Sequence, residues 1–464
     1  MLSQLEKKGR EASQIWSCSN KNCNGRIKVT NGVVVSQQPH IQQCTPRSER
    51  VLERNELRNV LKRKATEELS VRPLKLARQE LMKGDYKEVC ANDLSLVRRS
   101  VYREKHKVWP NIPKTNDEVQ AFLQKAFEEK SIKTSTGELF LYLSEKGLPM
   151  FTCQSNLRLM AHCTSLMGDG TFDKATKHTY QLYTIHGYLD GFHIPLAFFP
   201  LKGESQELYT EVWNLILREA DLIRSFVCPY AILFDFELGA HNAVRDPTYF
   251  GKNCNVKGCR FHFSQNLTKK IRGEPVLRTA YDKKQSGEMG DSNNEDDIPE
   301  RKWLLRFLGL SCLPPNWVGE TVQELEETRP EAQEYQVFLD YVKKTYSSPN
   351  STFPPCVWAS VPTMEPATTN GAEAFHCDFN SQFCAAHPNI FSSISILLEI
   401  QAQTYVKMNS IAAGERNYVE PKRLEIKQRR MRAWAEVVNG ERSVMSYCLY
   451  MGSLNAAMQK KKRV

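Results

Sequence analysis

The segment Leu166-Met167-Gly168-Asp169-Gly170-Thr171-Phe172 decides the predicted fold, because an apolar run ends there at a carboxylate. Two β-like segments follow, 179–188 and 193–201, with Asp190-Gly191 between them as a hairpin turn. Proline cannot donate a hydrogen bond to a neighbouring strand, so the two prolines of the second segment place it at a sheet edge. These segments predict a sheet that begins with an antiparallel hairpin.

A helix and a second apolar strand come next. Ser205 is a suitable N-cap, and apolar residues recur at helical spacing from Leu208 to Ile223. The continuously apolar run Tyr230–Phe234 is typical of a parallel strand covered on both faces, and Asp235 follows it. With a shorter strand around Val256–Cys259, the order of hairpin, crossover helix and parallel strands predicts an α/β fold with a ribonuclease H-like mixed sheet.

Carboxylates end both apolar strands, and a third carboxylate lies far downstream. Adjacent parallel strands lie about 5 Å apart, so Asp169 and Asp235 are expected at one end of the sheet, where they could share divalent metal ions. The segment Thr369-Asn370-Gly371-Ala372-Glu373, with its threonine as a helix cap, offers Glu373 as a third ligand. This set predicts a metal-dependent phosphoryl-transfer site. Each acid could instead be a solvated loop residue or a helix cap, and two other acids compete with the third, Glu237 and Glu365.

The N-terminal region has the spacing of metal ligands. Cys18 and Cys23 precede two short β-like runs joined by Asn31-Gly32, and His40 and Cys44 follow them. Two thiolates before a hairpin and a His/Cys pair after it can supply the four ligands of a closed tetrahedral zinc site. A module of this size buries too little apolar surface to fold without a bound metal ion that links its ends. The competing interpretation is that four unrelated reduced residues share this spacing by chance.

Charge is distributed unevenly along the 464 residues. Residues 1–110 carry 23 Lys and Arg against 12 Asp and Glu, residues 411–464 carry 12 against 5, and residues 111–410 carry 28 against 36. Basic ends favour contacts with a polyanion, although solvated helix faces explain any single short cluster. The start lacks a secretory h-region, and no apolar stretch reaches the roughly 18 residues of a membrane span. We therefore expect a soluble intracellular protein with no membrane partner, whose 14 cysteines are mostly reduced.

The predicted regions are, in chain order, a small β-rich zinc finger (1–46), a basic helical connector that can touch DNA phosphates (47–160), a ribonuclease H-like core (161–275 and 366–410), an acidic loop with a helical insertion (276–365), and a basic helical tail (411–464). Within the insertion, 281–300 is expected to be disordered and Trp303–Tyr346 helical. The tail ends in Lys460-Lys461-Lys462-Arg463, which suits a nuclear-import patch or a solvated basic tail equally well.

Four motifs in this order resemble the Mutator-like element (MULE) transposases: Asp169-Gly170-Thr171-Phe172, Asp235-Phe236-Glu237, Gly258-Cys259-Arg260-Phe261-His262 and Thr369-Asn370-Gly371-Ala372-Glu373. The residues Trp16-Ser17-Cys18, Cys23 and Gly25-Arg26 resemble a FLYWCH-type zinc finger, a module often found ahead of such a core. The resemblance covers residues 15–44 and 160–400.

The resemblance implies a DDE transposase core in which Asp169, Asp235 and Glu373 hold two Mg²⁺ or Mn²⁺ ions. Two hard cations about 4 Å apart would activate the attacking oxygen and stabilise the leaving 3′-oxygen of a DNA phosphodiester. The resemblance also implies Zn²⁺ in the finger, double-stranded DNA with terminal inverted repeats as the partner, and a homo-oligomer on that DNA. We expect a nuclear location.

His262 belongs to a C-x2-H element beside the second acid, where it could orient the scissile phosphate. The alternatives are a zinc site of Cys259 and His262 with Cys254, or a buried cysteine and a core histidine. The chain departs from the family in two places. No aromatic strand precedes Trp16, which predicts an N-terminally shortened finger, and no Cys/His-rich zinc module follows the core.

Two other functions remain open. The first is a domesticated, catalytically silent zinc-finger DNA-binding regulator, for which the finger and the basic N-terminal region would suffice. The second is a host nuclease of the same fold class that acts on DNA or RNA without strand transfer.

Overall fold

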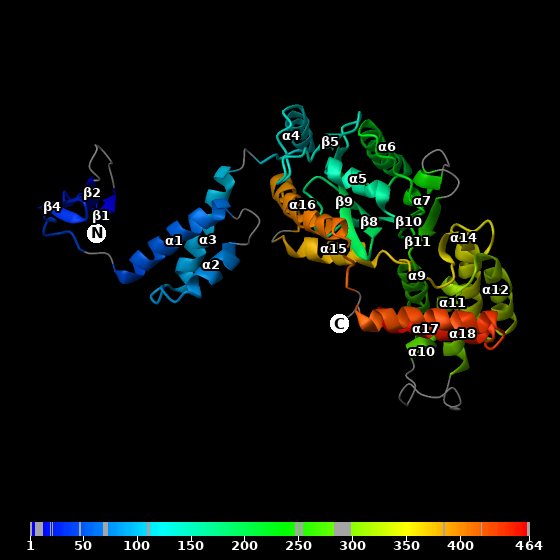
Figure 1. The fold of residues 1–464 in the computed structure, drawn as a ribbon. Helices are drawn as coiled ribbons and strands as arrows, with labels where there is room; N and C mark the ends of the chain where they lie inside the picture. Colours follow the sequence, from blue (N-terminus) through cyan, green and yellow to red (C-terminus); the bar gives the residue numbers. More distant parts are fainter. Residues whose placement is uncertain are drawn as a thin grey trace. The chain divides into compact units, whose positions relative to one another are not determined.

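The computed structural model divides the chain into two compact units, Met1–Asn111 and Ile112–Val464 (Figure 1). The structure describes residues 2–4, 13–18, 20, 22–45, 48–67, 73–108, 112–245, 250, 254–282, 298–383, 386–418 and 420–461. None of the helices formed by these residues has the length and apolar character that crossing a membrane requires.

The first unit begins with an antiparallel sheet of four strands in the order β1-β2-β3-β4. These strands are β1 Leu2–Gln4, β2 Ser13–Cys18, β3 Arg26–Thr30 and β4 Val33–Gln38. Asn31 and Gly32 connect β3 to β4 with φ angles of 49° and 79°. Both angles are left-handed, as a type I′ turn requires, so the hairpin predicted at Asn31-Gly32 is confirmed.

Three helices follow in the first unit: α1 Glu49–Glu67, α2 Pro73–Leu81 and α3 Ala91–Val108. Pro73 is the first residue of α2, where its missing N–H costs no intrahelical bond. The helices share a small apolar core whose members include Leu57, Leu61, Leu76, Val97 and Val101. This core explains why a strongly basic segment folds into packed helices.

The second unit opens with α4 Asn116–Glu128, a short hairpin of β5 Tyr142–Leu143 and β6 Pro149–Met150, and α5 Gln154–His162. In the apolar run of residues 139–143, only the last two residues form a regular strand. Asn156 on α5 exchanges two hydrogen bonds of 2.8 Å with Gln401 on α16 (Ile390–Ala412). Both amides are buried, so this pair fastens α5 to α16.

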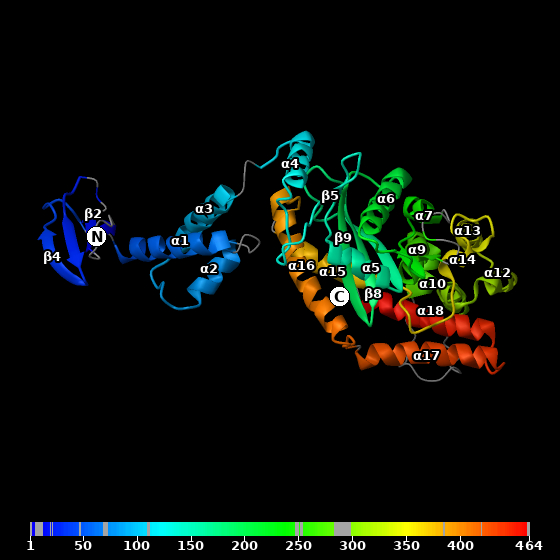
Figure 2. The same cartoon turned by 45° about the horizontal axis from the view of Figure 1, so that its top comes forward.

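The centre of the second unit is a mixed sheet of five strands, two of which, β8 and β9, are labelled in Figure 2; the order is β11-β10-β7-β8-β9. The strands are β7 Ser165–Thr171, β8 Gln181–Leu189, β9 Phe192–Leu201, β10 Ala231–Phe234 and β11 Asn255–Gly258. β8 pairs antiparallel with β7 and β9, whereas β7, β10 and β11 run parallel. The predicted hairpin and the edge position of the proline-containing strand are confirmed. β7 differs from the prediction because it continues two residues beyond Asp169.

Helices cover both faces of this sheet. α6 Gln206–Leu222 is capped as predicted, since Ser205 Oγ accepts a hydrogen bond from Leu208 N at 3.3 Å. α6 and α7 (Leu238–Arg245) pack with Ile232 and Phe234 on one face. On the opposite face, Phe198 of β9 meets Phe375 of α15 (Asn370–Ser381), with ring centroids 5.9 Å apart.

A helical subdomain separates β11 from α15. It contains α9 Arg260–Gly273, α10 Pro275–Asp282, α11 Pro299–Gly309, α12 Val318–Glu327, α13 Gln333–Val342 and α14 Pro355–Trp358, which confirms the predicted helices of 303–346. Most of the predicted acidic loop, 283–297, lies outside the described residues, while 281 and 282 belong to α10. The last two helices, α17 Pro421–Val438 and α18 Val444–Lys461, lie side by side (Figures 1 and 2), and α18 packs on α11.

Candidate active site and candidate metal centre

Asp169 and Asp235 come from neighbouring parallel strands. β7 and β10 pair through Met167 and Leu233, and Asp169 and Asp235 each follow two residues later towards the carboxyl ends of these strands. Side chains alternate along a strand, so Asp169 points to the same face as Met167, which is the face that α15 covers. The two carboxylates therefore lie at one end of the sheet, the position that the strand order predicts.

Glu373 reaches the same end of the sheet from α15. Gly371 permits the close approach of this helix, because a Cβ at that position would collide with the ring of His193 on β9. Thr369 precedes the helix as expected, but its hydroxyl does not cap it: Oγ1 is buried and makes no hydrogen bond. The Thr369 N–H instead donates to Cys259 Sγ at 3.2 Å, so the cysteine, and not a threonine cap, fixes the start of α15.

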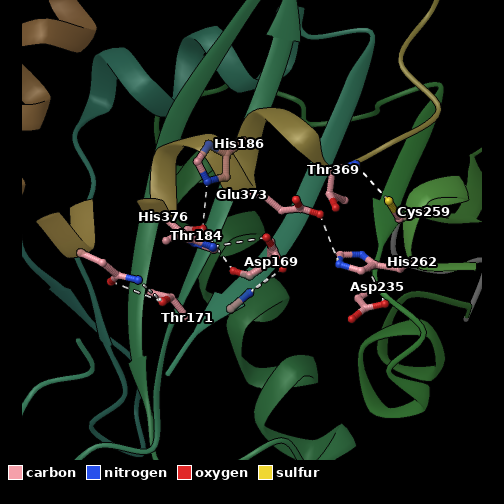
Figure 3. Close-up of polar contacts among 12 residues, drawn as sticks. Asp169, Thr171, Thr184, His186, Asp235, Cys259, His262, Thr369, Glu373 and His376 are labelled. Atoms are coloured by element: carbon pink, nitrogen blue, oxygen red, sulfur yellow. Dashed lines mark hydrogen bonds and ion pairs between the residues drawn. The ribbon is translucent and has the colours of Figure 1, made fainter. Parts of the chain in front are cut away.

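His262, on α9, lies between two of the acids. Its Nδ1 is 3.4 Å from Asp235 Oδ1, and its Nε2 is 3.2 Å from Glu373 Oε1 (Figure 3). Burial lowers the pKa of His262, but Cys259 and the two carboxylates raise it by more, to about 9. At neutral pH this raised pKa keeps the ring protonated, so it lies within ion-pair distance of both carboxylates as a cation.

A second histidine holds Asp169. His376 Nδ1 lies 3.3 Å from Asp169 Oδ2, and His376 Nε2 lies 2.8 Å from Thr184 Oγ1. The Thr184 hydroxyl donates to the backbone oxygen of Asp169 at 3.1 Å. Neither His376 nor Thr184 is assigned a role from the sequence. His376 follows Glu373 by one helical turn, a spacing that could have identified it, whereas nothing local in the sequence distinguishes Thr184.

The two acids that compete with Glu373 are placed differently. Tyr209 Oη donates to Glu237 Oε1 at 2.5 Å, and burial raises the pKa of Glu237 to about 7, with the charges of Asp235 and Asp169 adding to the effect. Glu237 is thus a half-buried carboxyl engaged by a tyrosine. Glu365 is an exposed loop residue. Glu373 is the candidate for the third ligand that shares an ion-pair partner, His262, with Asp235.

The carboxylate site fits a hard divalent cation in its donors, which are oxygens of three acids. In this structure His262 lies between two of these acids, Asp235 and Glu373. The ligand oxygens of these three acids do not lie close enough together to hold a single ion. Among the described residues, one group of three or more potential ligands does lie close enough, and it is in the first unit. An ion shared by Asp235 and Glu373 would require His262 to turn aside.

A zinc site of Cys254, Cys259 and His262 is excluded by the sheet. Cys254 and Cys259 flank the four-residue strand β11, so they are about 16 Å apart along the extended chain. Cys259 is fully buried and accepts the hydrogen bond from Thr369. Its role is to join α9 to α15.

The four ligand candidates of the first unit do meet. Cys18, Cys23, His40 and Cys44 place one ligand atom each within 4.8 Å of the others. The Cys18–Cys44 sulfur separation is 3.6 Å, and His40 Nδ1 lies 3.3 Å from Cys23 Sγ and 3.5 Å from Cys44 Sγ. A tetrahedron with zinc-type bond lengths has edges of about 3.5–3.8 Å, so the cluster is compatible with a zinc ion.

The electrostatics of this cluster also favour a cation. Backbone N–H groups, led by that of Gly25, lower the pKa of Cys23 to about 6. The pKa of Cys44 is raised to about 11, chiefly by the hydrogen bond between Cys44 and Cys18. Several thiolates can therefore coexist here only when a positive ion lies between them.

Comparison of the sequence with protein-family models and with curated proteins found no match. The functional assignment accordingly depends on the residues and the geometry of the two sites.

Proposed function

We propose that this protein is a DNA transposase of the Mutator-like class, which cleaves phosphodiesters and transfers DNA strands with the help of two metal ions. The observation that carries the proposal is the position of Asp169 and Asp235 at one end of adjacent parallel strands, with Glu373 beside them on α15. The strand order, with β8 alone running against the other four, agrees with the ribonuclease H-like core that the motif resemblance implies.

Asp169, Asp235 and Glu373 would hold Mg²⁺ or Mn²⁺, which supplies Lewis acidity for activating a water or a 3′-OH and for stabilising the leaving oxygen. His376 would orient the Asp169 carboxylate, and Thr184, which contacts His376 and the Asp169 backbone oxygen, would hold His376 in place. His262 carries a positive charge between the other two acids, so on turning away from them it could orient the scissile phosphate.

The first unit would bind the DNA. The Cys18, Cys23, His40 and Cys44 cluster suits a zinc finger of the FLYWCH type, and the basic residues of 1–110 suit phosphate contacts with the terminal repeats of an element. A homo-oligomer on paired DNA ends and a nuclear location complete the proposal.

Nicking of DNA tests it directly. Full-length protein with Mn²⁺ and a duplex carrying the inverted repeats that flank its coding sequence should yield nicked strands. Asp169→Asn should reduce nicking on the order of 10³-fold, because the removed charge contributes several kcal/mol to metal-assisted catalysis. Asp190→Asn is the matched control, since that exposed acid occupies a turn position which asparagine also favours. Undiminished nicking by Asp169→Asn would show that the site is misassigned.

A second candidate function is a DNA-binding protein that has lost the chemistry. The ion pairs of His262 with Asp235 and Glu373 favour it, because a charged histidine between two of the acids competes with a cation for their carboxylates. Tight, salt-sensitive binding to duplex DNA without metal-dependent nicking would support this function. Where nicking occurs, joined strands among the products would separate a transposase from a simple nuclease.

A further inference from the structure

Two aromatic side chains lie in contact on the surface beside the carboxylate site. Phe172 and Tyr180 begin and end the loop that connects β7 to β8, and they are 47% and 51% exposed. Their ring centroids are 5.3 Å apart at an interplanar angle of 74°. In this edge-to-face arrangement the two ring planes stand at a steep angle to each other, so the pair forms an apolar corner that is partly open to solvent. Single exposed aromatics are common on proteins, but a contacting pair needs a reason.

The pair is held in place relative to the acids. Phe172 follows Asp169 by three residues, so their Cα atoms are about 10 Å apart along an extended strand. Its neighbour Thr171 exchanges hydrogen bonds with Asn380 on α15, the helix that carries Glu373. Tyr180 N donates to Leu201 O at 2.7 Å. The position of the two rings is therefore determined by the same elements that position the carboxylates.

Lysines lie close to the two rings in the sequence. Lys174 and Lys177 belong to the same loop, and Lys202 follows Leu201, the residue to which Tyr180 is hydrogen-bonded. Asp173 is the acid of this loop. Exposed rings flanked by lysines are the composition of sites that bind single-stranded nucleic acid, where bases stack on the rings and the cations attract the backbone.

We propose that Phe172 and Tyr180 form a stacking site for one unpaired base of the DNA strand whose phosphate lies at Asp169 and Asp235. The inference rests on the proposed function and extends it: the strand end is bound melted, not fully paired. Stacking accepts any base, so this site contributes affinity and strand separation without reading sequence.

Fluorescent DNA tests this site. Full-length protein is titrated, in Ca²⁺ to suppress cleavage, with a duplex containing a three-nucleotide gap that carries 2-aminopurine, and with the fully paired duplex of the same sequence. We expect the gapped DNA to bind on the order of 10-fold more tightly and its 2-aminopurine fluorescence to be quenched. Phe172→Ala with Tyr180→Ala should abolish both effects, whereas Phe172→Tyr with Tyr180→Phe should preserve them.

Tyr230→Ala provides the matched control. Tyr230 is 70% exposed and lies at the start of β10, beside Thr164, at the other end of β7 from the site. This variant should keep the preference for gapped DNA. The stacking site is overturned if the double alanine variant keeps both the preference for gapped DNA and the quenching of 2-aminopurine. If the wild-type protein also nicks DNA with Mn²⁺, the proposed function stands and only the stacking site is lost. A wild-type protein that neither nicks nor binds any DNA would overturn the proposed function as well.

Discussion

At the scale of a residue, the raised pKa of His262, caused by Cys259 and by the two carboxylates, makes stability depend on pH. Its pKa rises from an ordinary value of 6.5 to about 9 in the folded protein. A raised pKa stabilises the folded state fully below the unfolded value, and this stabilisation is lost as the pH rises through the folded value. We expect the free energy of unfolding of the metal-free protein to fall by at most about 3 kcal/mol between pH 6.5 and pH 9.

Urea unfolding in EDTA at several pH values measures this fall. His262→Gln should lose less stability over the same pH range, because glutamine cannot carry the charge. His162→Gln is the control, since His162 is exposed at the end of α5. If the wild type and His262→Gln show the same pH dependence, Cys259, Asp235 and Glu373 do not raise the pKa of His262 in solution.

At the scale of an element, the docking of α15 decides where Glu373 lies. A Cβ at position 371 would collide with the ring of His193, so Gly371→Ala should push the start of the helix away from β9. Overpacking of this kind costs about 1–3 kcal/mol, and it displaces both Glu373 and His376. We expect a lower melting temperature and a loss of metal-dependent nicking larger than the loss of folded protein.

Gly319→Ala is the matched control for that variant. Gly319 is also helical, but nothing lies within 4 Å of a Cβ added to it. Alanine there should leave nicking unchanged and stabilise α12 by up to about 1 kcal/mol. Equal activity of the two variants would mean that the closeness of α15 to β9 does not matter for Glu373.

At the scale of the whole molecule, the two compact units should respond differently to removal of metal. Zinc in a small module contributes about 10 kcal/mol or more of folding free energy, so a strong chelator should unfold the N-terminal sheet. The unit Ile112–Val464 has large apolar clusters of its own, one with Trp303 and Phe263 and another with Trp213, and should remain folded. Calorimetry should show the loss of one transition and the survival of the other.

Cys18→Ser should reproduce the effect of the chelator. Cys90→Ser, which removes an exposed cysteine of the same unit, should not. Unfolding of both units by the chelator would show that their stabilities are coupled.

Local features of the chain were predictable from the sequence by itself. Asn31-Gly32 and Asp190-Gly191 form turns because few other residues adopt left-handed φ angles without strain. Ser205 caps α6 because its hydroxyl accepts an N–H three residues away. The strands around Asp169 and Asp235 follow from runs of apolar residues, and the Cys/His cluster follows from ligand spacing across a hairpin. All of these depend on interactions between near neighbours.

Only the tertiary structure decided how the acids are connected. His262 bridges Asp235 and Glu373, which lies more than one hundred residues away along the chain. Thr369 turns its amide toward Cys259, 110 residues away, where the sequence predicts a helix cap. Local rules assign a residue to a strand face or a helix turn, but they contain no information about which helix packs on which strand. That choice comes from burying the apolar faces of α9 and α15 against a sheet, a property of the whole chain.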